Sequence, residues 1–96
     1  MAHNHTTHAN RSKTITNFKK TQSLLGRIQK MLEEDAYCID IMQQNLAAIG
    51  LLKSAHQMLM EDHLHACFDE AIQSDDSEKK ARMTEEILTV TKLLNK

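Results

Sequence analysis

Two cysteines and a histidine, residue types that bind metal ions, are spaced so that they share one face of a predicted helix. They are Cys38, His63 and Cys67, and the last two are four residues apart. Side chains at this spacing are neighbours on a helix. Steps of 3.6 residues from Cys38 also reach His63 and Cys67, so the three share one stripe. Two thiolates and an imidazole suit trigonal Cu(I), and with a fourth ligand they suit Ni(II), Co(II) or Zn(II).

Each of these residues also has an ordinary structural explanation. A buried cysteine behaves as a small hydrophobic side chain, and His63 could be a hydrogen-bonded histidine at an interface. The shared stripe favours metal over these explanations. His56 lies on the same stripe and is expected to pack or to form a hydrogen bond, and His65 is expected to be solvated or to lie outside the ligand set. Three further histidines could supply ligands by folding back, or have no role: His3, His5 and His8.

The composition predicts an all-α fold. The chain has 96 residues with no Pro and two Gly, the two residues least compatible with helix interiors. It is rich in helix-forming residues, and β-branched residues show no sustained alternation. A flexible His-rich tail is expected over residues 1–10, followed by one helical domain over residues 11–96.

Three helices are expected within that domain, over residues 12–34, 36–73 and 76–95. The first has an apolar face at Ile15, Phe18, Leu25, Ile28 and Leu32. The break before the third is SDDSEKK (residues 74–80), where Asp75 and Glu78 resemble a capping pair. The third helix has apolar residues at helical spacing: Met83, Ile87, Val90 and Leu94.

The length of the central helix predicts an oligomer. Its 38 residues would extend about 57 Å, whereas a chain of this size is about 26 Å wide if globular. Cys38 and His63 would be about 37 Å apart on that helix. Two antiparallel copies with a two-fold axis near residue 51 or 52 place Cys38 of one chain between His63 and Cys67 of the other. Gly50 lies near this crossing, and each dimer would carry two identical sites.

Charge is divided unevenly along the chain. Residues 1–30 contain six Lys or Arg and no acid, and the remainder contains six Lys or Arg against thirteen acids, so the two parts are +6 and −7. A polyanion-binding surface near the N-terminus is one interpretation, and an ordinary solvated helix face is the other. There is no phosphate-binding loop and no nucleophile–base pattern, so we do not expect an enzyme or a small organic substrate. No signal peptide or membrane-length apolar run is present, which predicts a cytoplasmic protein with reduced thiols.

Residues 28–72 resemble the CsoR/RcnR family of bacterial metal-responsive repressors. The resemblance is carried by RIQKMLEEDAYCIDIMQQNLAA (residues 27–48) and EDHLHACFDEAI (residues 61–72). A Cys followed 25 residues later by His-x-x-x-Cys is the copper-sensor pattern of that family, matched at Cys38, His63 and Cys67. The resemblance implies a three-helix protomer, an antiparallel dimer and a dimer-of-dimers tetramer. It also implies that the metal-free protein binds operator DNA, that metal weakens this binding, and that the controlled genes encode an exporter or metal chaperone.

The resemblance assigns further residues. Tyr37 matches a tyrosine next to the metal ligands, where outer contacts orient them. A family glutamate on the third helix falls on Met83 by straight counting, and on Glu85 if the loop is longer by two residues. The basic Gly-Gln segment of the family is replaced here by FKKTQSLLGRI (residues 18–28), and an expected Arg falls on Asn17. Readout of DNA backbone and shape is expected, through these candidate contacts: Arg11, Lys13, Lys19, Lys20 and Arg27.

Several effectors and functions remain open. Nickel- and cobalt-sensing relatives add an N-terminal histidine, so Ni(II) or Co(II) is the alternative to Cu(I), with His3, His5 or His8 as the added ligand. Formaldehyde sensors differ at the Cys67 position and persulfide sensors lack the His63-type ligand, which disfavours both effectors. A metal-storage or delivery protein without DNA affinity, and a purely structural helical bundle, are the alternatives to a repressor.

Overall fold

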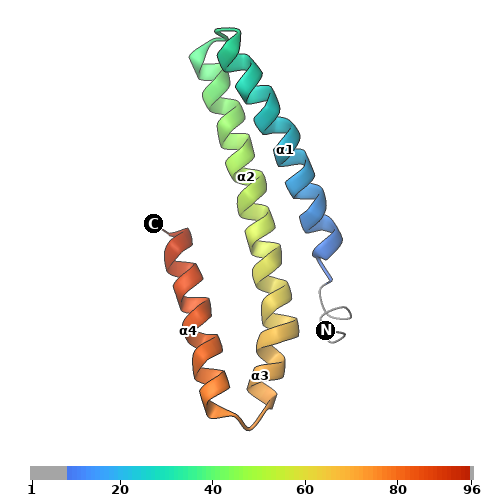
Figure 1. Cartoon of the computed structure of the whole chain (residues 1–96), viewed down its shortest axis with the longest axis vertical. Coiled ribbons are helices and arrows are strands. Elements are labelled where there is room, and N and C mark those ends of the chain that lie inside the picture. The colour runs from blue at the N-terminus through green and yellow to red at the C-terminus, as the bar shows by residue number, and fades with distance from the viewer. Residues whose placement is uncertain (1–8, 96) are drawn as a thin grey trace. The chain divides into compact units, whose positions relative to one another are not determined.

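The computed structural model describes residues 9–95, except for the side chains of residues 66–69 and 71 (Figure 1). Every regular element in this range is helical, which confirms the all-α prediction. In chain order, a long central run of helix follows the first helix and precedes the last, as expected. The elements are α1 (Arg11–Glu33), α2 (Cys38–Asp62), a π-helical turn η2 (His63–Phe68), α3 (Asp69–Gln73) and α4 (Ser77–Leu94). The predicted tail lies almost entirely outside the described residues.

The chain forms two compact units. One comprises Ala9–Glu61, in which α1 and α2 lie side by side as an antiparallel hairpin (Figure 1). The other includes residues 62–95, in which α4 folds back from α3 after a short bend. Among the described residues, no helix combines the length and apolar character needed to cross a membrane.

The two helices of the hairpin meet along a seam with a seven-residue repeat. The least exposed residues of each helix recur at alternating spacings of three and four, which is the pattern of coiled-coil seams. On α2 the two most buried are Ala48 and Ala55, whose small side chains allow close approach. The seam residues are Thr14, Asn17, Thr21, Leu24, Ile28 and Met31 on α1, and Ile41, Gln44, Ala48, Leu51, Ala55 and Met58 on α2.

The apolar face predicted for the first helix does not coincide with the seam of the hairpin. Of its members only Ile28 is buried; Phe18 and Leu32, for example, are 41% and 59% exposed. Threonines occupy the seam instead, because their hydroxyls donate to carbonyls of the preceding turn. The hydroxyl of Thr14 donates to Asn10 O at 2.9 Å, and that of Thr21 to Asn17 O at 2.8 Å. A buried hydroxyl satisfied in this way carries little desolvation penalty.

Asn17 links the two helices directly. Its side-chain Nδ2 donates to the backbone carbonyl of Leu51 at 3.3 Å. The half of the seam nearest the N-terminus is thus polar, with Thr14, Asn17 and Thr21. The half nearest the hairpin turn is apolar, with Leu24 and Ile28.

The turn between α1 and α2 ends α1 with a Schellman motif. Asp35 is in the left-handed region, with φ 54°. The N–H of Asp35 donates to Leu32 O at 3.3 Å, and the N–H of Ala36 to Met31 O at 2.9 Å. These are the two hydrogen bonds that define the motif, and glycine is the usual residue at the left-handed position.

Replacing Asp35 with glycine is therefore expected to stabilise the protein. Glycine removes the left-handed strain and a negative charge at a helix C-terminus, which outweighs its greater unfolded-state entropy by about 0.5 kcal/mol. Asp35→Val should instead destabilise by about 1 kcal/mol or more, because a β-branched residue is poorly accommodated there. Urea unfolding at one fixed protein concentration measures both changes, and equal stabilities for the glycine and valine variants would contradict the assignment.

Two predicted helix boundaries need correction. The central run begins at Cys38 rather than at residue 36, and it is not one continuous α-helix, because π winding replaces α winding over His63–Phe68. The last helix is capped by Asp76 rather than Asp75. The backbone of Asp76 is extended, and its carboxylate accepts from the N–H of Lys79 at 3.1 Å.

Candidate metal site and basic surface

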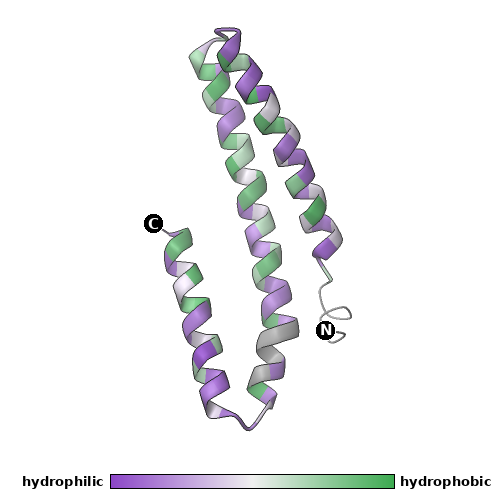
Figure 2. Cartoon of the chain, viewed as in Figure 1, coloured by the Kyte–Doolittle hydropathy of each residue, from purple (hydrophilic) through white to green (hydrophobic). Residues whose placement is uncertain are grey.

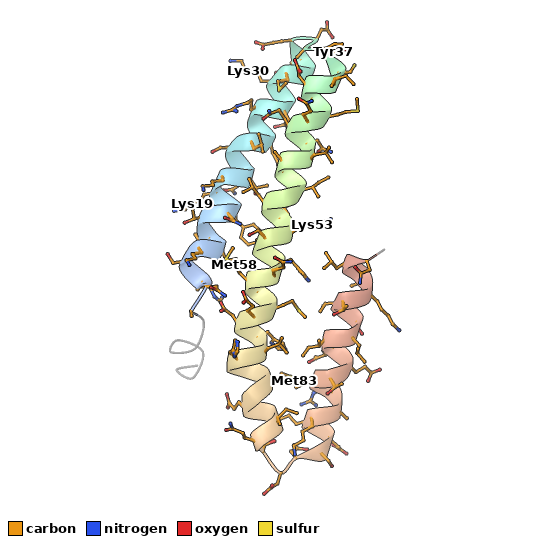
Figure 3. All side chains as sticks on the ribbon, turned by 180° about the vertical axis from the view of Figure 1, so that it is seen from behind. Lys19, Lys30, Tyr37, Lys53, Met58 and Met83 are labelled. Atoms are coloured by element: carbon orange, nitrogen blue, oxygen red, sulfur yellow. The ribbon has the colours of Figure 1, made fainter. Side chains whose placement is uncertain are left out.

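Cys38 is the first residue of α2 and its side chain is exposed. The carbonyl of Tyr37 accepts a hydrogen bond from the N–H of Ile41 at 3.2 Å, at the start of the helix. The positive end of the helix dipole favours negative charge at this place, which suits a thiolate ligand. The side chain of Tyr37 is 68% exposed and lies at the tip of the hairpin (Figure 3).

The other two candidate ligands belong to the π-helical turn. His63 opens the turn and is half-buried, and Cys67 lies within it, although its side chain is outside the described set. π-helical turns are rare and frequently occur at functional sites. The two residues lie in one helical segment of the backbone, but its winding is π rather than α, and their role as a ligand pair stays a prediction. His56 is half-buried on α2, and His65 is exposed in the turn.

Within one chain, the whole length of α2 separates Cys38 from His63. α2 has 25 residues, so its first residue is about 36 Å from its last along the helix axis. His63 directly follows that last residue. Among the side chains that the structure describes, no three His, Cys, Asp or Glu gather around a common point. The site between two subunits remains a prediction. It is based on the distance along α2, which is too long for one chain to supply both ends of the site.

The stripe that carries Cys38 is largely apolar and lies outside the seam of the hairpin. Figure 2 shows hydrophobic residues on surfaces of α2 outside its seam with α1. Half-buried His56 and Met60 extend the stripe toward His63. Large apolar side chains that are 40–52% exposed follow Cys38 along the stripe: Met42, Ile49 and Leu52.

Glu85, the residue expected to support the ligands, lies on α4 and is exposed; the alternative at this position, Met83, is half-buried. Glu85 and Tyr37 belong to different compact units. Their predicted role beside the ligands therefore stays untested. The histidines of the tail, His3, His5 and His8, are outside the described residues.

The five candidate DNA contacts on α1, Arg11, Lys13, Lys19, Lys20 and Arg27, are all exposed. Three of them form a row with a spacing of seven, and each member immediately precedes a buried residue of the seam. We call Lys13, Lys20 and Arg27 the basic row. Lys19 and Lys30 instead point away from α2 (Figure 3).

The opposite flank of the seam on α1 is apolar. Each residue of this apolar row immediately follows a seam position, and its members are Phe18, Leu25 and Leu32. Sequence reasoning grouped the members of the apolar row with Ile15 and Ile28 on one face, and it did not separate the basic row from the other basic residues of the first helix. The seven-residue spacing of the lysines and arginine was the signal that could have revealed the arrangement.

Comparison with known proteins identifies the family. Residues 10–96 match the model of the family described as "Metal-sensitive transcriptional repressor". The chain is 34% identical over 76 residues to the copper-sensing transcriptional repressor CsoR of Bacillus subtilis (strain 168), covering 79% of this chain and 75% of the relative. It is 34% identical over 64 residues to CsoR of Mycobacterium tuberculosis (strain H37Rv), covering 67% of this chain and 54% of that protein.

The copper-sensing transcriptional repressor RicR of the same M. tuberculosis strain is 26% identical over 76 residues, or 79% of each chain. No solved structure gives a significant match. The matched family consists of transcriptional repressors rather than enzymes. Its model covers all five helical elements of the structure. This chain therefore belongs to the family of metal-sensitive transcriptional repressors.

Proposed function

We propose that this protein binds operator DNA when metal-free and releases it when Cu(I) binds between two subunits. The ligands are Cys38 of one subunit and His63 and Cys67 of the other. Copper is supported by the names of the relatives, which are copper-sensing repressors. It is supported independently by the donor set, since two thiolates and one imidazole favour a soft cation such as Cu(I). The observation that carries the proposal is that Cys38 begins α2, whereas His63 and Cys67 belong to the turn that follows its last residue.

Each residue has a distinct part in the proposed switch. When bound, Cu(I) supplies a crosslink among three side chains. Cys38 presents a thiolate at the N-terminus of α2, and the turn that holds His63 presents the other donors. A ligand set shared by two subunits stabilises one arrangement of the oligomer over another, and DNA selects between the same arrangements.

The exposed apolar stripe of α2 supports the assembly. The described residues include only three buried apolar side chains, Ile28, Ala48 and Ala55, which is a very small core for a segment of this length. Burial of large apolar side chains is the main source of folding stability, so this chain needs a second copy to cover them. We propose an antiparallel dimer along the stripe and a tetramer of two such dimers.

The stability of the protein is accordingly expected to depend on its concentration. Folding that is coupled to association gives a thermal midpoint that rises with protein concentration, by several degrees between about 1 and 100 µM. Circular dichroism melts over this range measure the shift. Ile49→Lys, which places a charge in the centre of the stripe, should lower the midpoint and weaken association in analytical ultracentrifugation. A midpoint independent of concentration would contradict the proposed assembly.

Two alternatives remain as proposals. Ni(II) or Co(II) could be the effector if His3, His5 or His8 completes a four-ligand site. A storage or delivery protein would bind metal without DNA affinity, although membership of a repressor family argues against it.

Anaerobic titration of the reduced protein with Cu(I), and separately with Ni(II), tests the function. Fluorescence anisotropy on DNA from the protein's own promoter is the readout. We expect one Cu(I) per subunit and release of DNA. Release by Ni(II) alone, lost on deletion of residues 1–8, would instead identify a nickel sensor. Metal binding without DNA affinity at any salt concentration would overturn the repressor proposal.

A further inference from the structure

Two polar side chains interrupt the middle of the apolar stripe on α2. They are Asn45, which is exposed, and His56, which is half-buried. No hydrogen bond within the described part of the chain uses either side chain. If a second copy covers the stripe, each of them must find a partner there or lose its hydrogen bonds to water, which costs free energy. Their positions therefore restrict how a second copy can bind.

Two antiparallel copies of the stripe mesh only at certain registers. Spacings of four and three alternate along it, so two copies interlock again only when one slides by seven residues along the other. Leu59, at the edge of the stripe, completes this alternation and is 38% exposed. The positions that interlock, which we call the meshing positions, are Cys38, Met42, Asn45, Ile49, Leu52, His56, Leu59 and His63.

One register pairs the two polar residues with each other. When the two-fold axis lies between Gly50 and Leu51, Asn45 of each subunit faces His56 of the partner subunit. The axis is then at the middle of α2, so this register also covers the longest stretch of the stripe. The other meshing positions pair as Ile49 with Leu52, Met42 with Leu59, and Cys38 with His63. The polar pair and the proposed ligands thus favour the same register independently.

The two neighbouring registers each leave a polar side chain opposite an apolar one or a thiol. A slide in one direction places Asn45 opposite His63 and His56 opposite Leu52. A slide in the other direction places Asn45 opposite Ile49 and His56 opposite Cys38. Neither register brings Cys38 to His63.

We propose that Asn45 and His56 form a hydrogen bond across the dimer, and that this pair selects the register that the metal site needs. A carboxamide and a neutral imidazole each carry a donor and an acceptor, so the two side chains can satisfy each other. A polar pair within an apolar seam fixes the register, because a slip leaves its members unpaired. Two-fold symmetry gives the dimer two such bonds.

The pair acts on the metal-free protein. It rests on the proposed antiparallel dimer, to which it adds the residues that align the two copies before metal arrives. Cu(I) held by Cys38 and His63 would maintain the same register by itself. Loss of the pair is therefore compatible with a retained copper response, and its effect is read without copper.

Engineered cysteines report the register directly. In chains that carry Cys38→Ser and Cys67→Ser, Asn45→Cys with His56→Cys reports the proposed register, and Asn45→Cys with His63→Cys reports one neighbouring register. The other neighbouring register is reported by His56→Cys with Cys67→Ser and an unchanged Cys38. Within one chain the members of each pair are about 16 Å or more apart, which is too far for a disulfide.

Diamide oxidation followed by non-reducing electrophoresis measures the rate at which covalent dimers form. We expect the Asn45→Cys, His56→Cys chains to crosslink at least about tenfold faster than either other pair, because only their thiols face each other. Asn45→Cys alone and His56→Cys alone should remain uncrosslinked, since each cysteine is about 16 Å from its own copy along the seam.

The outcomes separate this pair from the proposed function. Faster crosslinking of a neighbouring register, or equal rates for all three, would refute the proposed pair. The function would still stand if Cu(I) released DNA from the unsubstituted protein. Crosslinking of no pair would refute both this pair and the antiparallel dimer on which the proposed metal site depends.

Thermal unfolding at one protein concentration tests whether the two side chains interact. Asn45→Leu and His56→Leu are compared singly and together. Each single variant leaves a polar group opposite leucine, whereas the double variant is apolar on both sides. The midpoint of the double variant should exceed the sum of the single changes by about 4 °C or more. The control substitutions Gln43→Leu and Gln57→Leu, exposed on another face of α2, should be additive. Additive changes at Asn45 and His56 would overturn the hydrogen bond.

Discussion

Replacing Cys38 with alanine is expected to preserve DNA binding and to abolish its response to copper. The side chain is exposed and lies outside the seam of the hairpin, so its loss should leave the fold intact. Without it, the proposed site keeps two donors from one subunit and no link to the other. Coupling between two sites commonly changes affinity by about 5- to 150-fold. We expect saturating Cu(I) to weaken DNA binding by about tenfold or more in the unsubstituted protein, and by less than about twofold in Cys38→Ala.

Asn45→Ala is the matched control for this variant. Asn45 is exposed on the same stripe of α2 but offers no soft ligand. The control should retain the copper response. Anisotropy titrations of both variants at one salt concentration give the comparison. DNA release by Cys38→Ala at the same copper concentration as the unsubstituted protein would exclude the proposed link between subunits.

Neutralising the basic row is expected to reduce DNA affinity more than neutralising any other three basic residues of α1. In the variant Lys13→Gln, Lys20→Gln and Arg27→Gln, each lost phosphate contact should reduce the slope of log K against log salt by about 0.9, or by about 2.7 for each α1 helix on the DNA. The three residues of the basic row are spaced seven residues apart beside the seam, so their charges lie on one side of α1. Anisotropy at a series of salt concentrations measures the slope.

A second triple variant removes the same charge from other faces of α1. It carries Gln at Arg11, Lys19 and Lys30, of which the last two point away from α2 (Figure 3). If the basic row makes the contacts, this variant should keep most of the salt dependence. Equal losses in the two variants would show that net charge, and not the row, determines binding.

The fold class could be predicted from composition because nothing in the chain opposes helix formation. The absence of Pro predicted helices throughout. The acidic break before α4 and the apolar residues at helical spacing within α4 predicted that the last helix is separate. The seam of α1 could not be predicted in this way, since Thr14 and Thr21 look like surface residues. Their hydroxyls bond within their own helix, and only the structure shows that this makes them compatible with burial.

The candidate site was predicted in its residue types and only partly in its geometry. The spacing of His63 and Cys67 placed them in one helical segment. The π winding left no mark in the sequence, because HLHACF reads as ordinary α-helix. Cys38 is at the other end of α2, so the complete site depends on a second chain, which a single sequence indicates only through the length of the helix.

The polar half of the hairpin seam also bears on how quickly the protein is degraded. The N-terminal half of α1 buries Thr14, Asn17 and Thr21 where an apolar seam would bury leucines, so its local opening is the least costly in the hairpin. The lysines of that half are natural cleavage points for a protease. In the proposed complex, DNA covers this segment and holds it closed. Release from the operator is therefore expected to make this segment more accessible to a protease such as trypsin.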